Sequence, residues 1–327
     1  MKILIYRISS IGDIVLTSPI VRCLKKQRPE DELHFLTREC YAETMSENPY
    51  ITKLWTVKKS PMEIADNLKK ENFDCMIDLH KNIRSFSLLA RLRIRYYTFN
   101  KLNFYKWIFT KFKKNLLPDI HIVDRYFKAV KNLNVKNDDL GLDFFMPKNI
   151  QIDAKIPEKY IVFAIGGTFF TKRYPKEKIV EFVKKSSLPV VLLGGKKDKE
   201  NASFIEKSNS DKVFNLCAKL SLYGSAEIIK NASVVVSNDT GMMHIAAALH
   251  KPTVSIWGNT VPAFGMYPYF PKEIKENYVI IENKNLKCRP CSKLGFDSCP
   301  KKHFDCMQKI EADLIVDAVE KLMKNNT

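Results

Sequence analysis

Polar loops that follow short apolar runs hold the residues of this sequence best suited to chemistry. The first is Ser9-Ser10-Ile11-Gly12-Asp13, after an apolar run that starts at Lys2. Gly12 permits a tight turn, and Asp13 stands where a helix would begin. A carboxylate there can cap the helix, or it can act as a general base at the mouth of a cleft. The loop is not a dinucleotide fingerprint, because G-x-G-x-x-G is missing.

Two loops in the second half favour phosphate. Ser237-Asn238-Asp239-Thr240-Gly241 precedes a helix with a thin alanine face, and the free N–H groups at such a helix start bind anions. His244 would reach a phosphate or ribose from the first turn, or it is a hydrogen-bonded core histidine. Gly166-Gly167-Thr168 leads to Lys172 and Arg173. These cations would neutralise a leaving diphosphate, unless they only form a solvated face.

Four cysteines lie within 19 residues: Cys288, Cys291, Cys299 and Cys306. The first pair has the spacing of zinc ligands, whereas the second pair is wider than a usual knuckle. Free, partly buried thiols are the alternative. No apolar run approaches the ~20 residues of a membrane span, and we expect a cytosolic protein with reduced thiols.

The apolar runs alternate with longer amphipathic stretches, which predicts an α/β protein with parallel sheets. Strands are expected at 2–8, 33–37, 53–57, 73–78, 161–165, 190–193, 233–237 and 253–257. Helices are expected at 14–27, 120–133, 179–185, 221–230, 242–249 and 310–324. The rhythm restarts after the polar stretch 134–157, so two doubly wound domains, 1–150 and 151–327, would face a central cleft. The last helix can pack on either.

The net charge of +18, from 54 Lys plus Arg against 36 Asp plus Glu, favours a polyanionic partner. Residues 91–114 interleave cations with aromatic side chains. As a basic helix this stretch would suit an anionic membrane surface. The same residues could stack on single-stranded nucleic acid, or the aromatics could simply belong to the core.

The motifs together resemble the lipopolysaccharide heptosyltransferases, glycosyltransferase family 9. The likeness rests on Ser-Ser-Ile-Gly-Asp at 9–13, Asn-Asp-Thr-Gly-x-x-His at 238–244, and Lys-Pro-Thr-Val-Ser-Ile-Trp-Gly-Asn-Thr at 251–260. It implies a GT-B fold and inverting transfer from ADP-heptose, with no metal or other cofactor. The implied acceptor is a phosphorylated lipid A and core oligosaccharide at the inner membrane. We expect a peripheral, monomeric enzyme that binds no nucleic acid.

The resemblance also implies roles for particular residues. Asp13 would be the base and Lys172 the second catalytic residue. The donor would be held by Thr168, Asn215, Asp239, Thr240, Gly241 and His244. Residues 81–149 carry little of the resemblance, but we also expect the acceptor to be held by Ser10, Lys81, Arg84, Arg91, Arg93 and Arg95. The chain departs from the family at Asn259, where many members have proline, and at Asn215, where one branch has an acidic residue.

Three other functions fit parts of the sequence. A transferase of the same fold could use another nucleotide sugar or acceptor. A nucleic-acid-binding module would account for the charge and the aromatic stretch, but it would leave the phosphate loops unexplained. A two-lobed binding protein without chemistry would require Asp13 to be dispensable.

Overall fold

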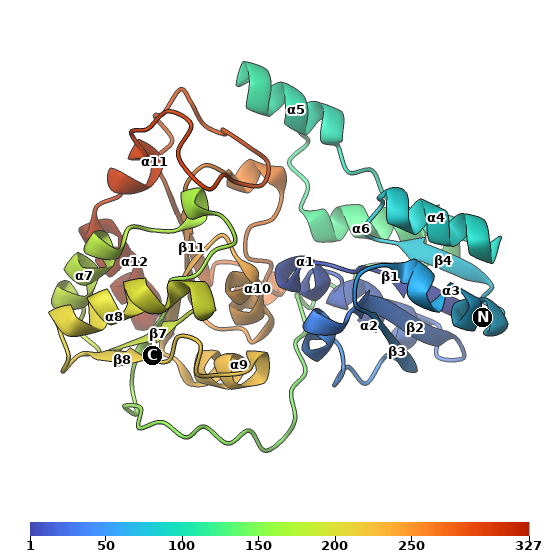
Figure 1. The fold of residues 1–327 in the computed structure, drawn as a ribbon, viewed down its shortest axis with the longest axis horizontal. Helices are drawn as coiled ribbons and strands as arrows, with labels where there is room; N and C mark the ends of the chain where they lie inside the picture. The colour runs from blue at the N-terminus through green and yellow to red at the C-terminus, as the bar shows by residue number, and fades with distance from the viewer. Residues whose placement is uncertain (327) are drawn as a thin grey trace. The chain divides into compact units, whose positions relative to one another are not determined.

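The computed structural model describes residues 1–326 and divides the chain into two compact units, each built on a parallel sheet (Figure 1). Unit 1 comprises Met1–Lys101 and Ile120–Pro147, and unit 2 comprises Leu102–Asp119 and the chain from Lys148 onward. The change of unit after Pro147 falls inside the polar stretch 134–157. The predicted first domain also included residues 102–119, which the contacts of the chain group with unit 2.

Unit 1 holds a five-stranded sheet in the order β3-β2-β1-β4-β5. Its strands are β1 (Lys2–Tyr6), β2 (Glu32–Arg38), β3 (Lys53–Val57), β4 (Cys75–Asp78) and β5 (Arg95–Thr98). Its helices are α1 (Ile11–Val15), α2 (Ser18–Gln27), α3 (Ala65–Lys70), α4 (Ile83–Leu92) and α6 (Ile122–Val130). Leu4 and Tyr6 of β1 share a core with Leu68 of α3 and Leu88 of α4. Because side chains alternate along a strand, Ile3 and Ile5 face the opposite layer.

Unit 2 holds a six-stranded sheet in the order β11-β10-β9-β6-β7-β8. Its strands are β6 (Ile161–Ala164), β7 (Val190–Leu193), β8 (Val213–Asn215), β9 (Val234–Asn238), β10 (Thr253–Trp257) and β11 (Tyr278–Glu282). Its helices are α5 (Asn103–Phe112), α7 (Lys176–Lys185), α8 (Lys199–Ser208), α9 (Leu222–Asn231), α10 (Gly241–Ala248), α11 (Asp305–Gln308) and α12 (Ala312–Asn325). The last helix, α12, packs on this sheet beside α7 (Figure 1).

Two predicted helices are wrong in extent. The helix expected at 14–27 is two helices, α1 and α2, because the chain breaks at Leu16–Thr17 and restarts with Pro19 in the first turn of α2. Proline lacks an N–H group and is tolerated only at such a start. The stretch 91–114 is not one basic helix: it contains the end of α4, the strand β5, and α5. The strands β5, β8 and β11 were not predicted.

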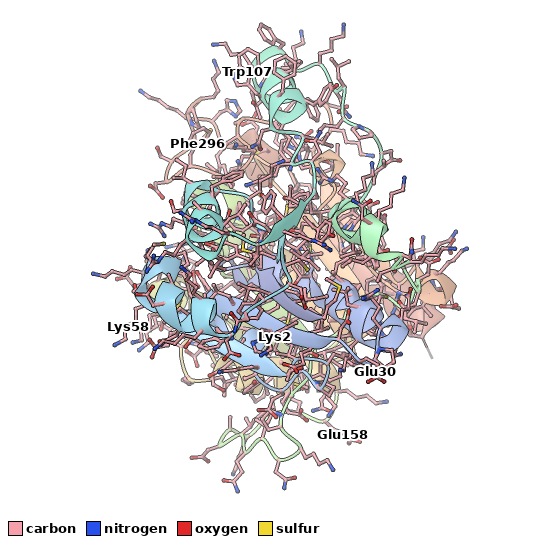
Figure 2. The ribbon with its side chains drawn as sticks, turned by 90° about the vertical axis from the view of Figure 1, so that its right-hand side faces the viewer. Lys2, Glu30, Lys58, Trp107, Glu158 and Phe296 are labelled. Atoms are coloured by element: carbon pink, nitrogen blue, oxygen red, sulfur yellow. The ribbon has the colours of Figure 1, made fainter. Side chains whose placement is uncertain are left out.

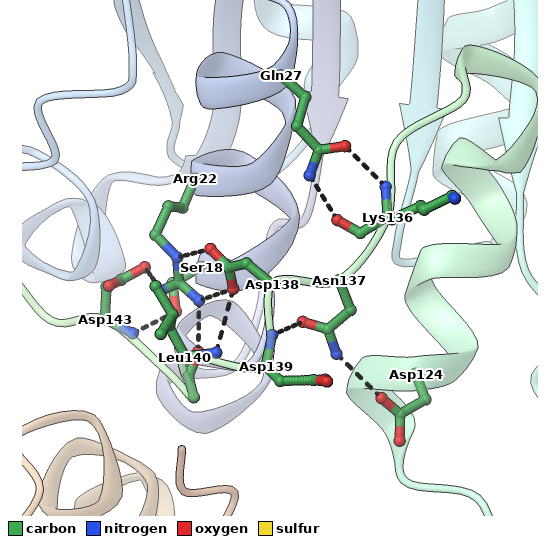
Figure 3. A network of polar contacts seen from close by, with 11 residues as sticks. Ser18, Arg22, Gln27, Asp124, Lys136, Asn137, Asp138, Asp139, Leu140 and Asp143 are labelled. Carbon is green, nitrogen blue, oxygen red and sulfur yellow. Dashed lines mark hydrogen bonds and ion pairs between the residues drawn. The ribbon is translucent and has the colours of Figure 1, made fainter. Parts of the chain in front are cut away.

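The buried guanidinium of Arg22 fixes the return of the chain at residues 138–143 onto α2 (Figure 3). It donates to both carboxylate oxygens of Asp138, at 2.8 and 2.9 Å, and to the Gly141 carbonyl at 2.9 Å. It also pairs with Asp143. Burial raises the pKa of the Asp143 carboxyl above its ordinary value, although Arg22 opposes this shift. Removing the guanidinium would leave two half-buried carboxylates without a counter-charge, which is destabilising.

Within residues 1–326, no helix combines the length and the apolar composition needed to cross a membrane.

Candidate active site

The predicted loops lie at the point of each sheet where the winding reverses. In unit 1 this point is between β1 and β4, and in unit 2 it is between β6 and β9. Ligands of open parallel sheets bind at such points, outside the carboxyl ends of the strands. The loops that start at Arg7 and Leu79 meet in unit 1, and those that start at Ile165 and Asp239 meet in unit 2.

The Asp13 carboxylate occupies the third position of a capping box on α1. Its Oδ2 accepts from the Ser10 N–H at 3.2 Å and from the Ser10 hydroxyl at 2.9 Å. Its Oδ1 lies 2.6 Å from the Arg7 guanidinium, and the Asp13 side chain remains 25% exposed. The N-cap of α1 is thus Ser10 rather than Asp13, and Asp13 completes the capping box while still presenting an accessible carboxylate.

Arg7, a residue that the sequence reading missed, anchors this carboxylate. Its guanidinium is buried and also donates to the Leu79 carbonyl and to the Tyr126 hydroxyl. Burial lowers the pKa of Arg7, but Asp13, Tyr126 and Asp78 together raise it, and the net shift is upward. Burial raises the pKa of Tyr126 to about 12, so this partner stays a neutral phenol. These contacts hold the Asp13 carboxylate in one place beyond the end of β1.

His80 follows β4 beside Arg7 and Asp13. Burial, reinforced by the charge of Arg7, lowers its pKa to about 3, so the imidazole is neutral near pH 7. Among residues 1–326, its buried Nδ1 has no hydrogen-bond partner. His80 is thus a neutral polar group, and a protonation step near neutral pH cannot be assigned to it.

In unit 2, Lys172 and Asp239 form an ion pair with 2.6 Å between Lys172 Nζ and Asp239 Oδ2. The same nitrogen lies 3.3 Å from the Asp239 carbonyl. Thr260, in the turn after β10, donates its hydroxyl to Asp239 Oδ2 at 2.8 Å. Lys172, Asp239 and Thr260 thereby join the loops after β6, β9 and β10. The sequence predicted that the first two of these loops lie together.

Asn238 ties the strand ends to these loops. Its amide donates to the carbonyls of Ile165 at 3.1 Å and Gly166 at 3.0 Å, and its oxygen accepts from the Tyr174 N–H at 3.1 Å. Arg173 donates to the Gly167 carbonyl at 2.8 Å, so its cation is committed to the loop. These four hydrogen bonds are more than a solvated face requires, and they indicate a rigid turn.

The remaining predicted donor residues take different positions. Thr168 is exposed, and Thr240 caps α10, whose first residue is Gly241. The Thr240 hydroxyl lies 3.3 Å from that of Ser237. His244 is only 2% exposed, which favours the core reading over a contact with phosphate.

Asn215 lies apart from this group. It ends β8, the edge strand, and β7 stands between β8 and β6. Its amide donates to Glu206 at 2.9 Å, and its oxygen accepts from the Cys217 N–H at 3.1 Å. One branch of the family has an acidic residue at the position of Asn215. In this chain the carboxylate beside that position belongs to Glu206.

The residues predicted to hold the acceptor are divided between the two ends of the unit 1 sheet. Lys81 follows β4 on the Asp13 side, with its ammonium 3.2 Å from the Phe99 carbonyl. Arg84, the second residue of α4, is exposed and donates to the Lys59 carbonyl.

Arg91, Arg93 and Arg95 lie elsewhere. Arg95 begins β5 opposite Cys75, the first residue of β4, and so marks the amino edge of the sheet. Arg91 pairs with Asp66 at 2.5 Å. The structure does not bring these three arginines together with Asp13, which lies at the carboxyl edge of the sheet. The prediction placed them wrongly because β5 was not recognised in the sequence.

The four cysteines are free thiols between β11 and α12, three of them on the loop and Cys306 in α11. Cys288 Sγ lies 3.9 Å from His303 Nε2, and burial raises the pKa of Cys306 to about 12. In the part of the chain that the structure describes, no three His, Cys, Asp or Glu side chains are arranged to hold a metal ion. This arrangement gives the zinc expectation no support.

The comparisons with known proteins agree with this architecture. The model of glycosyltransferase family 9 (heptosyltransferase) matches residues 62–299. Lipopolysaccharide heptosyltransferase 1 of Campylobacter coli is 24% identical over 290 residues, which cover 80% of this chain and 84% of that protein.

Two solved structures share the fold. A family 9 glycosyl transferase from Veillonella parvula has a TM-score of 0.78 at 19% identity, covering 99% of this chain and 97% of its own. E. coli ADP-heptose LPS heptosyltransferase II has a TM-score of 0.75 at 18% identity, covering 100% and 99%. The predicted GT-B class, with two Rossmann-like parallel-sheet units, is confirmed. The family model spans more than half of the chain, so the protein is a glycosyltransferase and belongs to glycosyltransferase family 9, the heptosyltransferase family.

Proposed function

We propose that this enzyme transfers heptose from ADP-heptose to a lipopolysaccharide inner-core acceptor, with inversion and without a metal ion. The main support is the joining of Lys172, Asp239 and Thr260 beside the start of α10. A cation and a helix N-terminus at one switch point suit a nucleoside diphosphate. The names of the relatives, heptosyltransferases acting on lipopolysaccharide or lipooligosaccharide, support the sugar and the acceptor.

The chemistry assigned to these residues is a single displacement. Asp13 takes the proton of the acceptor hydroxyl while that oxygen forms a bond to the anomeric carbon. The bond from that carbon to the diphosphate breaks, and ADP leaves with the bonding electrons. Lys172 and the N–H groups at the start of α10 stabilise the charge that develops on the diphosphate.

A ligand screen tests the donor. ADP-heptose and ADP should raise the unfolding midpoint of the protein, because a ligand bound only to the folded state stabilises it by about 2.7 kcal/mol at a hundredfold excess over Kd. UDP-, GDP- and CDP-sugars at matched concentrations are the controls. Turnover in EDTA, with the anomeric configuration of the product read by NMR, tests the metal and the stereochemistry. Equal stabilisation by bulk DNA, lost with salt, would favour the nucleic-acid-binding alternative instead.

We also propose that α5 contacts an anionic membrane surface. Phe104, Trp107 and Phe112 of this helix are 66, 52 and 62% exposed, and α5 has no buried residue (Figure 2). Phe104 stacks on Trp107, and Trp107 meets Phe112 edge-on, with centroids 6.1 and 5.5 Å apart. The opposite side of the helix holds it to unit 2 through Phe109, which packs on Phe264.

Cations accompany this aromatic face. Lys111, Lys113 and Lys114 are exposed around the end of α5. Exposed aromatics beside lysines match the interface between lipid headgroups and acyl chains, where rings insert and ammonium groups meet anionic lipids.

The double variant Trp107→Ala/Phe112→Ala should bind phosphatidylglycerol vesicles about 10-fold or more weakly, because two inserted rings are lost. Sedimentation of vesicles measures this, and ADP affinity should not change. Phe204→Ala is the matched control, since Phe204 is also an exposed aromatic of unit 2, at 45% exposure. If the control and the double variant bind vesicles equally well, α5 is not the membrane contact.

A further inference from the structure

One arginine of the cysteine-rich loop, Arg289, makes several hydrogen bonds to the turn after β10, and the proposed function gives it no role. Arg289 stands between Cys288 and Cys291, and it is 7% exposed. Its guanidinium donates to the carbonyls of Gly258, Trp257 and Thr260, the last at 2.9 Å. The sequence reading passed over this residue, because only its cysteine neighbours form a motif.

The charge of Arg289 is compensated from the neighbouring strand. Its Nη2 lies 2.9 Å from Glu282 at the end of β11, and its Nη1 donates to the Asn283 carbonyl at 2.6 Å. The buried guanidinium is bonded to one carboxylate and four carbonyls, and these bonds hold its planar group in one orientation. Arg289 is therefore rigid, and it is bonded to the backbone on both sides of Asn259.

The turn that Arg289 grips carries Thr260, the residue that donates to Asp239. The turn is tightly enclosed: a Cβ at Gly258 would lie 2.7 Å from the Thr171 carbonyl and from Met307. The Cys291 N–H adds a bond to the Asn259 carbonyl at 3.0 Å. The position of the Thr260 hydroxyl thus depends on contacts that the 286–306 loop provides.

We propose that Arg289 is a positioning residue of the donor site. It holds the 257–260 turn so that Thr260 keeps Asp239 against Lys172. The effect on the donor is indirect: Arg289 orders the turn, Thr260 orients the carboxylate, and the carboxylate holds the ammonium group that meets the diphosphate. This inference rests on the proposed function, since it assumes that Lys172 and Asp239 bind the donor.

A double-mutant cycle on ADP affinity tests this order of action. Arg289→Met should raise the Kd for ADP about 10-fold, and Thr260→Val should raise it several-fold. If Arg289 acts through Thr260, the double variant should bind ADP no more weakly than Arg289→Met alone. Arg289→Lys keeps the charge opposite Glu282 with fewer bonds to carbonyls, and it should fall between Arg289→Met and the unmodified protein. The acceptor KM should not change in any of these variants.

A control separates positioning from general stability. Arg22→Met removes a buried arginine of unit 1 that also holds a turn, and it should lower the unfolding midpoint without changing the Kd for ADP. Calorimetry below the midpoint of every variant gives the affinities, and circular dichroism checks the fold.

The outcomes are distinct. A double variant whose loss equals the product of the two single losses would overturn the positioning role, as would Arg289→Met binding ADP like the unmodified protein. If the unmodified protein does not bind ADP, the proposed function fails and the inference fails with it.

Discussion

Asp13→Asn should lower the turnover of transfer about 100-fold or more, the scale expected when a general base is lost. Asparagine keeps the size of the side chain and an oxygen that can accept from Ser10 at the start of α1. It cannot take a proton from the acceptor hydroxyl. The affinity for the donor should change little, because the residues assigned to the donor belong to unit 2. Steady-state kinetics and calorimetry with ADP measure the two quantities.

The loss of the ion pair with Arg7 needs its own control, because it also affects the fold. Asp66→Asn removes a carboxylate of the same unit that pairs with an arginine, Arg91, at 2.5 Å. This variant should keep turnover within about 2-fold, since an exposed ion pair contributes little. Turnover by Asp13→Asn near that of Asp66→Asn would leave Asp13 with the capping role alone.

Lys172→Ala should reduce kcat about 100-fold and also weaken ADP binding. The ammonium would stabilise charge on the leaving diphosphate, and the loss of one such group costs about 10²–10³ in rate. The variant also frees the Asp239 carboxylate from its partner at 2.6 Å, and this carboxylate would then repel the diphosphate. Lys172→Ala/Asp239→Asn should therefore recover part of the affinity for ADP without recovering kcat.

Lys178→Ala serves as the matched control, since Lys178 is a lysine of α7 that pairs with Glu311, the N-cap residue of α12, at 2.7 Å. It should behave as the unmodified protein. Full activity of Lys172→Ala, or a strict requirement of the unmodified enzyme for added magnesium, would contradict the assignment.

The sequence predicted the donor loops because of a simple property of parallel sheets. Asp239 and Lys172 follow buried β-branched runs, and the carboxyl ends of adjacent parallel strands meet at one edge. Local sequence patterns were therefore sufficient to predict β6, β9 and the loops that follow them. Asp13 was placed in the same way, since β1 is an apolar run followed by a glycine turn.

Contacts between distant segments were not predictable from such patterns. Arg289 reaches the end of β10 from a loop without periodicity, and Arg7 acquires its role only because β1 adjoins β4. The three arginines 91, 93 and 95 were misplaced because β5 has only four residues and follows α4 closely. For α5, the same alternation of aromatics and lysines fits a core helix or an exposed one, and only the burial of its residues decides between them.

The membership of residues 102–119 in unit 2 limits how this gene can be recombined. A single crossover after Pro147, which would exchange the halves between relatives, separates α5 from its packing partner Phe264 and Lys113 from the Pro290 carbonyl. The second half from one relative would then have to pack against an α5 from the other relative, whose sequence has changed independently. Functional chimaeras should accordingly require two exchanged segments, 102–119 together with the chain from Lys148, so that the unit of inheritance is discontinuous in the sequence.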